Sequence, residues 1–156
     1  MRKLAPLLVI GVVWTWTAGA LSGGEPGGKA KYVGGTVPEI PQGVDGVIQT
    51  IHREYFQFLT RKGALEISYT DINLLEYGQK AGRRYIMAVL ISPVLLLSKG
   101  RNHYLTVGYS DGEGKQQALV FQIDKNDIRS VLVSLEARTG RKVDYQDDEA
   151  RKAGKG

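Results

Sequence analysis

The imidazole and thiol side chains that most often carry catalysis or bind metals are scarce in this chain. Its only histidines are His52 and His103, neither lies in an H-E-x-x-H pattern, and there is no cysteine. Thiolate zinc sites, cysteine nucleophiles and disulfide frameworks are therefore excluded. We expect each histidine to lie on a sheet face and to hydrogen-bond a neighbour. No catalytic residue, serine nucleophile, metal site or cofactor is expected.

Glycine-rich and acidic stretches are the next candidates for chemistry. Residues 23–30 have the glycines and lysine of a phosphate-binding P-loop, but Ala30 stands where a hydroxyl must hold magnesium. The acids of residues 147–149 fall in a charge-dense stretch, where nothing would desolvate them. Isolated acids in predicted strands are expected to face outward and keep the sheet soluble, and these are Glu66, Asp71 and Glu76.

An apolar run with basic flanks is the strongest candidate for contact with another molecule. The run covers residues 85–97, follows two arginines, and is followed by Ser-Lys-Gly-Arg. As a helix it would span about 20 Å, which is too short to cross a bilayer, and Pro93 opposes an unbroken helix.

A reversal of the chain at Pro93 would bring Arg84 opposite Arg101, so that an apolar tip with a cationic base could enter a membrane interface. The alternatives are that the run folds back to cap the core or docks on a partner protein. The candidate contact residues are Arg83, Arg84, Leu90, Pro93, Leu95, Leu96, Lys99 and Arg101.

The first twenty residues have the organisation of an export signal. A basic head at Arg2 and Lys3 precedes a mostly apolar stretch, and small residues at 18–20 suit a signal peptidase. We expect cleavage after Ala20 and a protein that is periplasmic or secreted. The alternative is an uncleaved membrane anchor, although the stretch is slightly short for a span.

The charge balance does not indicate nucleic-acid binding. The formal net charge of +5 is mild, falls by two if residues 1–20 are removed, and is not gathered into a basic stripe. We expect no nucleic-acid partner.

The 156 residues suffice for one domain. We expect a glycine-rich linker at residues 21–30, a domain at 31–140 and a charged tail at 141–156 that frays after one possible packed turn, with only Val143 and Tyr145 to bury. Within the domain, apolar residues alternate with period two between turn signals, which predicts a curled or closed antiparallel sheet. The predicted strands are residues 31–37, 46–53, 55–60, 64–69, 72–78, 102–109 and 116–123.

The last two predicted strands form the clearest hairpin, because residues 103, 105, 107 and 109 of one share a face, as do 119, 121 and 123 of the other. The glycines of residues 108–114 suit its turn. One amphipathic helix follows, with Asp124 or Asn126 as its cap and Gly140 after its end. Its predicted buried residues are Ile128, Val131, Leu132 and Leu135.

Seven short strands followed by one C-terminal amphipathic helix resemble the pleckstrin-homology-like (PH-like) superfold, with its GRAM and bacterial PH-like relatives. Four stretches, at residues 32–36, 67–72, 103–107 and 135–142, are also similar to a family of exported bacterial proteins of unknown function. The resemblance implies a mainly β fold and export, but no reaction. It does not extend to an inositol-lipid site, because residues 38–45 carry two acids and no base.

These observations favour a non-enzymatic binding or scaffold module of the cell envelope. Its contact with a membrane surface or another envelope protein would be made through residues 85–97. One alternative is a carrier of a small molecule or lipid in the interior of the barrel, with the same run as its lid. A hydrolase with a scattered site is a further alternative.

Overall fold

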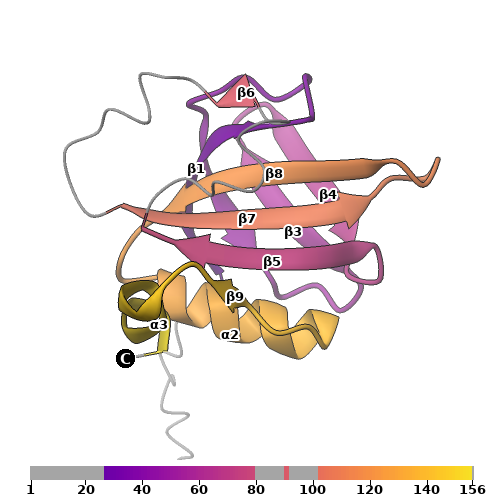
Figure 1. The fold of residues 1–156 in the computed structure, drawn as a ribbon. Coiled ribbons are helices and arrows are strands. Elements are labelled where there is room, and N and C mark those ends of the chain that lie inside the picture. The colour runs from indigo at the N-terminus through magenta and orange to yellow at the C-terminus, as the bar shows by residue number, and fades with distance from the viewer. Residues whose placement is uncertain (1–26, 80–89, 92–101, 156) are drawn as a thin grey trace, which may run out of the picture.

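The computed structural model describes residues 27–79, 90–91 and 102–155 (Figure 1). Within these ranges nine strands form one sheet with the main order β4-β3-β2-β1-β8-β7-β5-β9, and β6 pairs with β1. All pairings are antiparallel except that of β5 with β9. The strands are β1 (Gly27–Gly35), β2 (Asp45–Gln49), β3 (Tyr55–Thr60), β4 (Gly63–Ser68), β5 (Ile72–Gly78), β6 (Leu90–Ile91), β7 (His103–Ser110), β8 (Gln116–Ile123) and β9 (Asp144–Tyr145).

All seven predicted strands are present, and the mainly β class is confirmed. The bounds of β3, β5 and β8 are as predicted, whereas β2 ends at Gln49, before His52. The β7–β8 register also confirms the predicted hairpin, since Leu105 faces Phe121 and Val107 faces Leu119. The sheet is curled but not closed, because β4 and β9 end its path within the described ranges.

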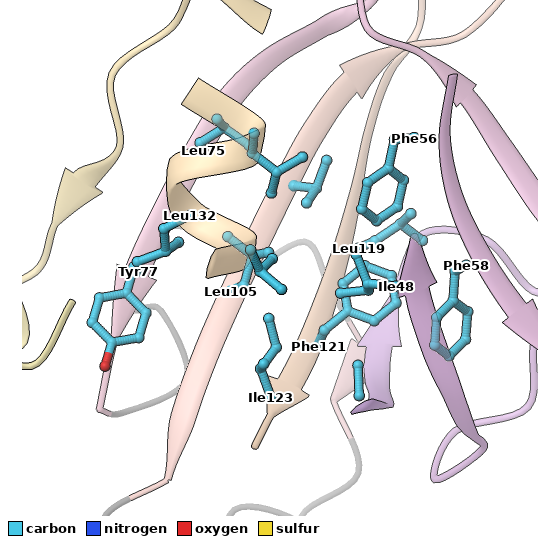
Figure 2. Close-up of a cluster of buried hydrophobic side chains, with 14 of the residues drawn as sticks. Ile48, Phe56, Phe58, Leu75, Tyr77, Leu105, Leu119, Phe121, Ile123 and Leu132 are labelled. Carbon is cyan, nitrogen blue, oxygen red and sulfur yellow. The ribbon is translucent and has the colours of Figure 1, made fainter. Parts of the chain in front are cut away.

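The inner side of the sheet and the helix α2 (Ile128–Thr139) enclose one apolar core. Figure 2 shows phenylalanines of β3 and β8 gathered there, with Leu132 reaching the core from α2. The rings of Phe58 and Phe121 lie 4.8 Å apart, and both are fully buried. Burial of each such side chain contributes about 1.5–3 kcal/mol, so the core is the main source of stability.

The helix α2 has the predicted buried stripe and C-terminus but a different N-cap. Its buried residues are those expected, and Gly140 adopts the left-handed conformation with φ 68°. The N-cap is Asp127, whose side chain does not cap the helix and instead accepts a hydrogen bond of 2.9 Å from the backbone N–H of Lys29. The carboxylate therefore joins the helix to β1 rather than satisfying its first amides.

The predicted linker at residues 21–30 is wrong at its C-terminal end. Residues from Gly27 onward belong to β1, where Gly27 pairs with Gln49 and Ala30 with Ile123. A Cβ atom on Gly28 would lie 2.4 Å from that of Asp127. These glycines therefore allow the strand to pass close to the start of α2, a need that a local composition signal does not reveal.

Val143 and Tyr145 pack as the prediction allowed, but the prediction that the residues after them fray is wrong. The short strand β9 adds to the edge of β5, and the helix α3 (Asp148–Lys155) follows it. Val143 and Ala150 join the core, and Gly154 allows α3 to approach Tyr145, whose ring a Cβ atom would meet at 2.6 Å. Figure 1 shows α2 and α3 together at one end of the sheet, with β6 at the opposite end.

None of the helices in the described ranges combines the length and apolar character required to cross a membrane.

Candidate functional site

Most of the predicted contact residues lie outside the described residues. This is the case for Arg83, Arg84, Pro93, Leu95, Leu96, Lys99 and Arg101. Leu90 belongs to β6, whose backbone pairs antiparallel with the end of β1, Gly35 opposite Leu90 and Gly34 opposite Ile91. Leu90 and Ile91, in the middle of the apolar run, therefore lie beside the last residues of β1.

A rim hollow of about 450 Å³ lies at that end of β1. Thr36 fixes its wall, because its N–H donates to the carbonyl of Ala118 at 2.9 Å and its Oγ1 accepts the N–H of Ala118 at 3.0 Å. The residues that line the rim hollow are Tyr32, Gly35, Thr36, Val37, Pro38, Ile40, Pro41 and Gln42. These residues carry no charge, so they offer an anion no charged partner.

Tyr32 is the titratable group of the rim hollow. Burial raises its pKa to about 12, the neighbouring Tyr109 and the Glu39 carboxylate act in the same direction, and a hydrogen bond with the Val37 backbone opposes them. The phenol is therefore protonated at neutral pH and acts as a hydrogen-bond donor, not as a base. Gly35 makes room for it, since a Cβ atom there would lie 2.5 Å from the Tyr32 hydroxyl oxygen.

The outer face of the sheet, on the side away from the core, holds a second group of buried side chains. Val33, Val120 and Thr106 expose only 0, 1 and 2% of their surface, although none belongs to the core cluster. Val33 occupies a β-bulge of β1, and Thr106 faces Val120 across β7 and β8. We define the outer-face patch as Val33, Tyr104, Thr106, Ala118 and Val120.

Glu76, which faces Thr106 of the outer-face patch, is not the exposed acid that was predicted. Glu66 and Asp71 are exposed as expected, but Glu76 is 7% exposed. Its Oε1 accepts a hydrogen bond of 2.9 Å from Gln146 Nε2. Residues after β9 therefore cover this carboxylate, which explains why it does not behave as an outward-facing acid.

His103 lies on a sheet face with a hydrogen-bonded neighbour, Tyr77, as expected. Its Nδ1 and the Tyr77 hydroxyl are 2.5 Å apart, and the two rings are stacked. Burial lowers the pKa of His103; Asp124 opposes this effect and Lys125 adds to it. Burial also raises the pKa of Tyr77 to about 12, helped by Tyr145 and Asp147. Both groups are neutral near pH 7, so the hydrogen bond that joins the two side chains is one between neutral groups.

The second histidine lies in a bend and not on a sheet face. His52 Nδ1 accepts the backbone N–H groups of Glu54 and Tyr55, each at 3.2 Å. It shapes the connection between β2 and β3, which is why the predicted strand ends early. Among the described residues, no group of three or more histidines or acids could hold a metal ion.

Residues 108–112 read Gly-Tyr-Ser-Asp-Gly, which is the spacing of a serine nucleophile elbow, and the sequence prediction did not take this match into account. An elbow joins a strand to a helix, whereas Ser110 ends β7 and the chain turns into β8. Asn73 Nδ2 donates to Ser110 Oγ at 3.1 Å. His103 is at the other end of the same strand, about 23 Å away. Ser110 is therefore a residue of the β7–β8 hairpin and not of a nucleophile elbow.

The sequence prediction did not include the outer-face patch, because alternation of apolar and polar residues indicates strands that are buried on one face only. Residues 118–121 read Ala-Leu-Val-Phe, an unbroken apolar run in the middle of β8. Such runs are typical of strands buried on both faces. This signal would have predicted that something covers the outer face as well.

No family model matches this chain, and no curated protein matches it.

Proposed function

We propose that the protein is a non-enzymatic binding module of the cell envelope, built on a PH-like body and attached to an anionic membrane surface. The open sheet of seven longer strands followed by α2 supports the PH-like assignment, since this is the element order of that superfold. The aromatic residues that fill the inner side of the sheet favour a contact on the outside of the body over a ligand carried within it.

The pairing of β6 with β1 is the observation that carries this proposal. It attaches the middle of the apolar run to Gly34 and Gly35, at the end of the sheet opposite α2 (Figure 1). Leu90 and Ile91 thus lie at that end of the sheet, where Gly35 also lines the uncharged rim hollow. Basic residues flank the apolar run on both sides in the sequence and would meet lipid phosphates there.

Co-sedimentation with vesicles tests the proposal. The chain from residue 21 to 156 should bind phosphatidylcholine vesicles that contain phosphatidylglycerol, and bind less as salt rises. Leu95→Glu should abolish binding. Arg84→Glu should weaken it roughly 30-fold, at about 1 kcal/mol per unit of charge. Val133→Glu changes an exposed residue of α2 and is the matched control.

Binding by neither the parent chain nor the variants would contradict the membrane function. Equal binding by parent, Leu95→Glu and Arg84→Glu would contradict the proposed contact and direct the search to another surface.

A further inference from the structure

The outer-face patch requires a cover that the core does not provide. Its side chains are buried, but the core cluster and α2 lie on the other side of the sheet. The cover therefore lies on the outer side. Ala118 and Val120 of β8 face Gly108 and Thr106 of β7 in the register, which makes the patch continuous across these strands.

The C-terminal elements account for only one edge of this face. Gln146 covers Glu76 and lies against Gly78, both on β5. Val33 lies on β1, four strand positions from β9 in the sheet order. At about 4.8 Å per strand this separation is about 19 Å. Another segment must therefore cover the β1 and β8 side of the patch.

Three features suit the connection between β5 and β7 to this role. They are the positions where it begins and ends, its length, and its pairing with β1 through β6. Gly78 faces Tyr104 in the register, so a turn of a few residues would join the two strands. Instead the chain reaches β1, three strands from β5, and returns from it. Residues 79–89 can extend about 36 Å, more than twice the roughly 14 Å to be crossed. A path around the end of the sheet would leave Val120 and Thr106 uncovered.

We propose that the outer-face patch is the seat of the chain's own apolar run, residues 85–97. In the free protein the run packs across β7 and β8 toward β6, and forms a second apolar layer opposite the core. This inference goes beyond the proposed function, because it states where the run sits when no membrane is present.

Cysteine pairs provide a direct test, because the natural chain has no cysteine. Val120→Cys is combined in turn with a cysteine at each position from 85 to 97, and the chain is oxidised without lipid. Thr106→Cys with Val120→Cys is the positive control, since these residues face each other. Val47→Cys, on the exposed outer side of β2, is the matched negative control.

We expect intramolecular disulfides between Val120→Cys and one or more positions of the run, formed at least about tenfold faster than with Val47→Cys. Ala118→Cys replaces Val120→Cys if the latter does not fold. No disulfide with the run, equal rates with Val47→Cys, or disulfides only between two molecules would each overturn the inference. Since lipid is absent, these outcomes are independent of the vesicle experiment.

Discussion

Two buried tyrosines differ in what their hydroxyl groups contact. Tyr77 and His103 form a hydrogen bond at the end of β5 and β7. The hydroxyl of Tyr69 is buried with no hydrogen-bond partner in the described part of the chain, and burial raises the pKa of its phenol, an effect that Arg138 opposes. A buried polar group is stabilising only when it is paired, so the same substitution should have opposite effects at the two positions.

We predict that Tyr77→Phe lowers the free energy of unfolding by about 1 kcal/mol, because it removes a hydrogen bond. Tyr69→Phe should leave the free energy of unfolding unchanged or raise it by up to about 1 kcal/mol, since it removes an unpaired hydroxyl. Urea unfolding of both variants measures the difference. Equal destabilisation by both would contradict the assigned contacts.

The buried imidazole predicts how stability depends on pH. Burial lowers the pKa of folded His103 below the ordinary 6.5, so the unfolded chain binds its proton more readily. The contribution of neutral His103 to stability is therefore complete above about pH 6.5 and is lost as pH falls toward the folded-state pKa. Unfolding measured between pH 7.5 and 5 should show this loss.

The variant His103→Asn should have a shallower dependence of stability on pH over the same range. The same slope in His103→Asn as in the parent chain would contradict the assignment.

Helix α2 shows how much of one element depends on its buried face. Leu135 is fully buried, whereas Val133, two residues earlier, is 60% exposed. Because the helix covers the inner side of the open sheet, its buried stripe contributes to the whole core and not only to helix formation.

We predict that Leu135→Ala lowers the free energy of unfolding by about 2–5 kcal/mol, through lost burial and the cavity left behind. Val133→Ala should change it by less than about 0.5 kcal/mol. Chemical denaturation of the two variants provides the comparison. A loss below 1 kcal/mol for Leu135→Ala would show that α2 is not part of the core.

Elements with a local signal were predicted well, and those that depend on distant partners were not. The β7–β8 hairpin and the stripe of α2 follow from alternation and helical spacing. The first residues of β1 look like a linker, because Gly28 is explained only by the approach of Asp127. The charged sequence of α3 gives no signal that Ala150 is buried, because this burial depends on the surface that β5 and α2 provide. The candidate site was predicted as a segment, without the outer-face patch.

At the scale of the whole molecule, the C-terminal residues pack against the core and the β5 edge of the sheet. Val143 and Ala150 enter the core, and Tyr145 packs edge-on against Tyr77 at 5.9 Å between ring centroids. Arg151 and Lys155 lie 5.9 and 5.4 Å from the Tyr145 ring centroid, so two cations of α3 contact its ring. The basic residues that suggested a solvated tail also hold it in place.

We predict that ending the chain after Lys142 lowers the free energy of unfolding by about 3 kcal/mol, because it exposes the surface under Val143, Tyr145 and Ala150. Gly154→Val should reproduce part of the loss, since a larger side chain cannot fit beside Tyr145. Thermal and urea unfolding measure both changes. A truncated chain as stable as the parent would mean that α3 does not dock.

The pairing of β1 with β8 joins Ala30 to Ile123. During synthesis the first strand must therefore wait, with one side unpaired, until most of the polypeptide has left the ribosome. That unpaired side is an open strand edge on the hairpins of β1 to β4, and an edge of this kind is where two unfinished copies of the chain would pair with each other before β8 is made.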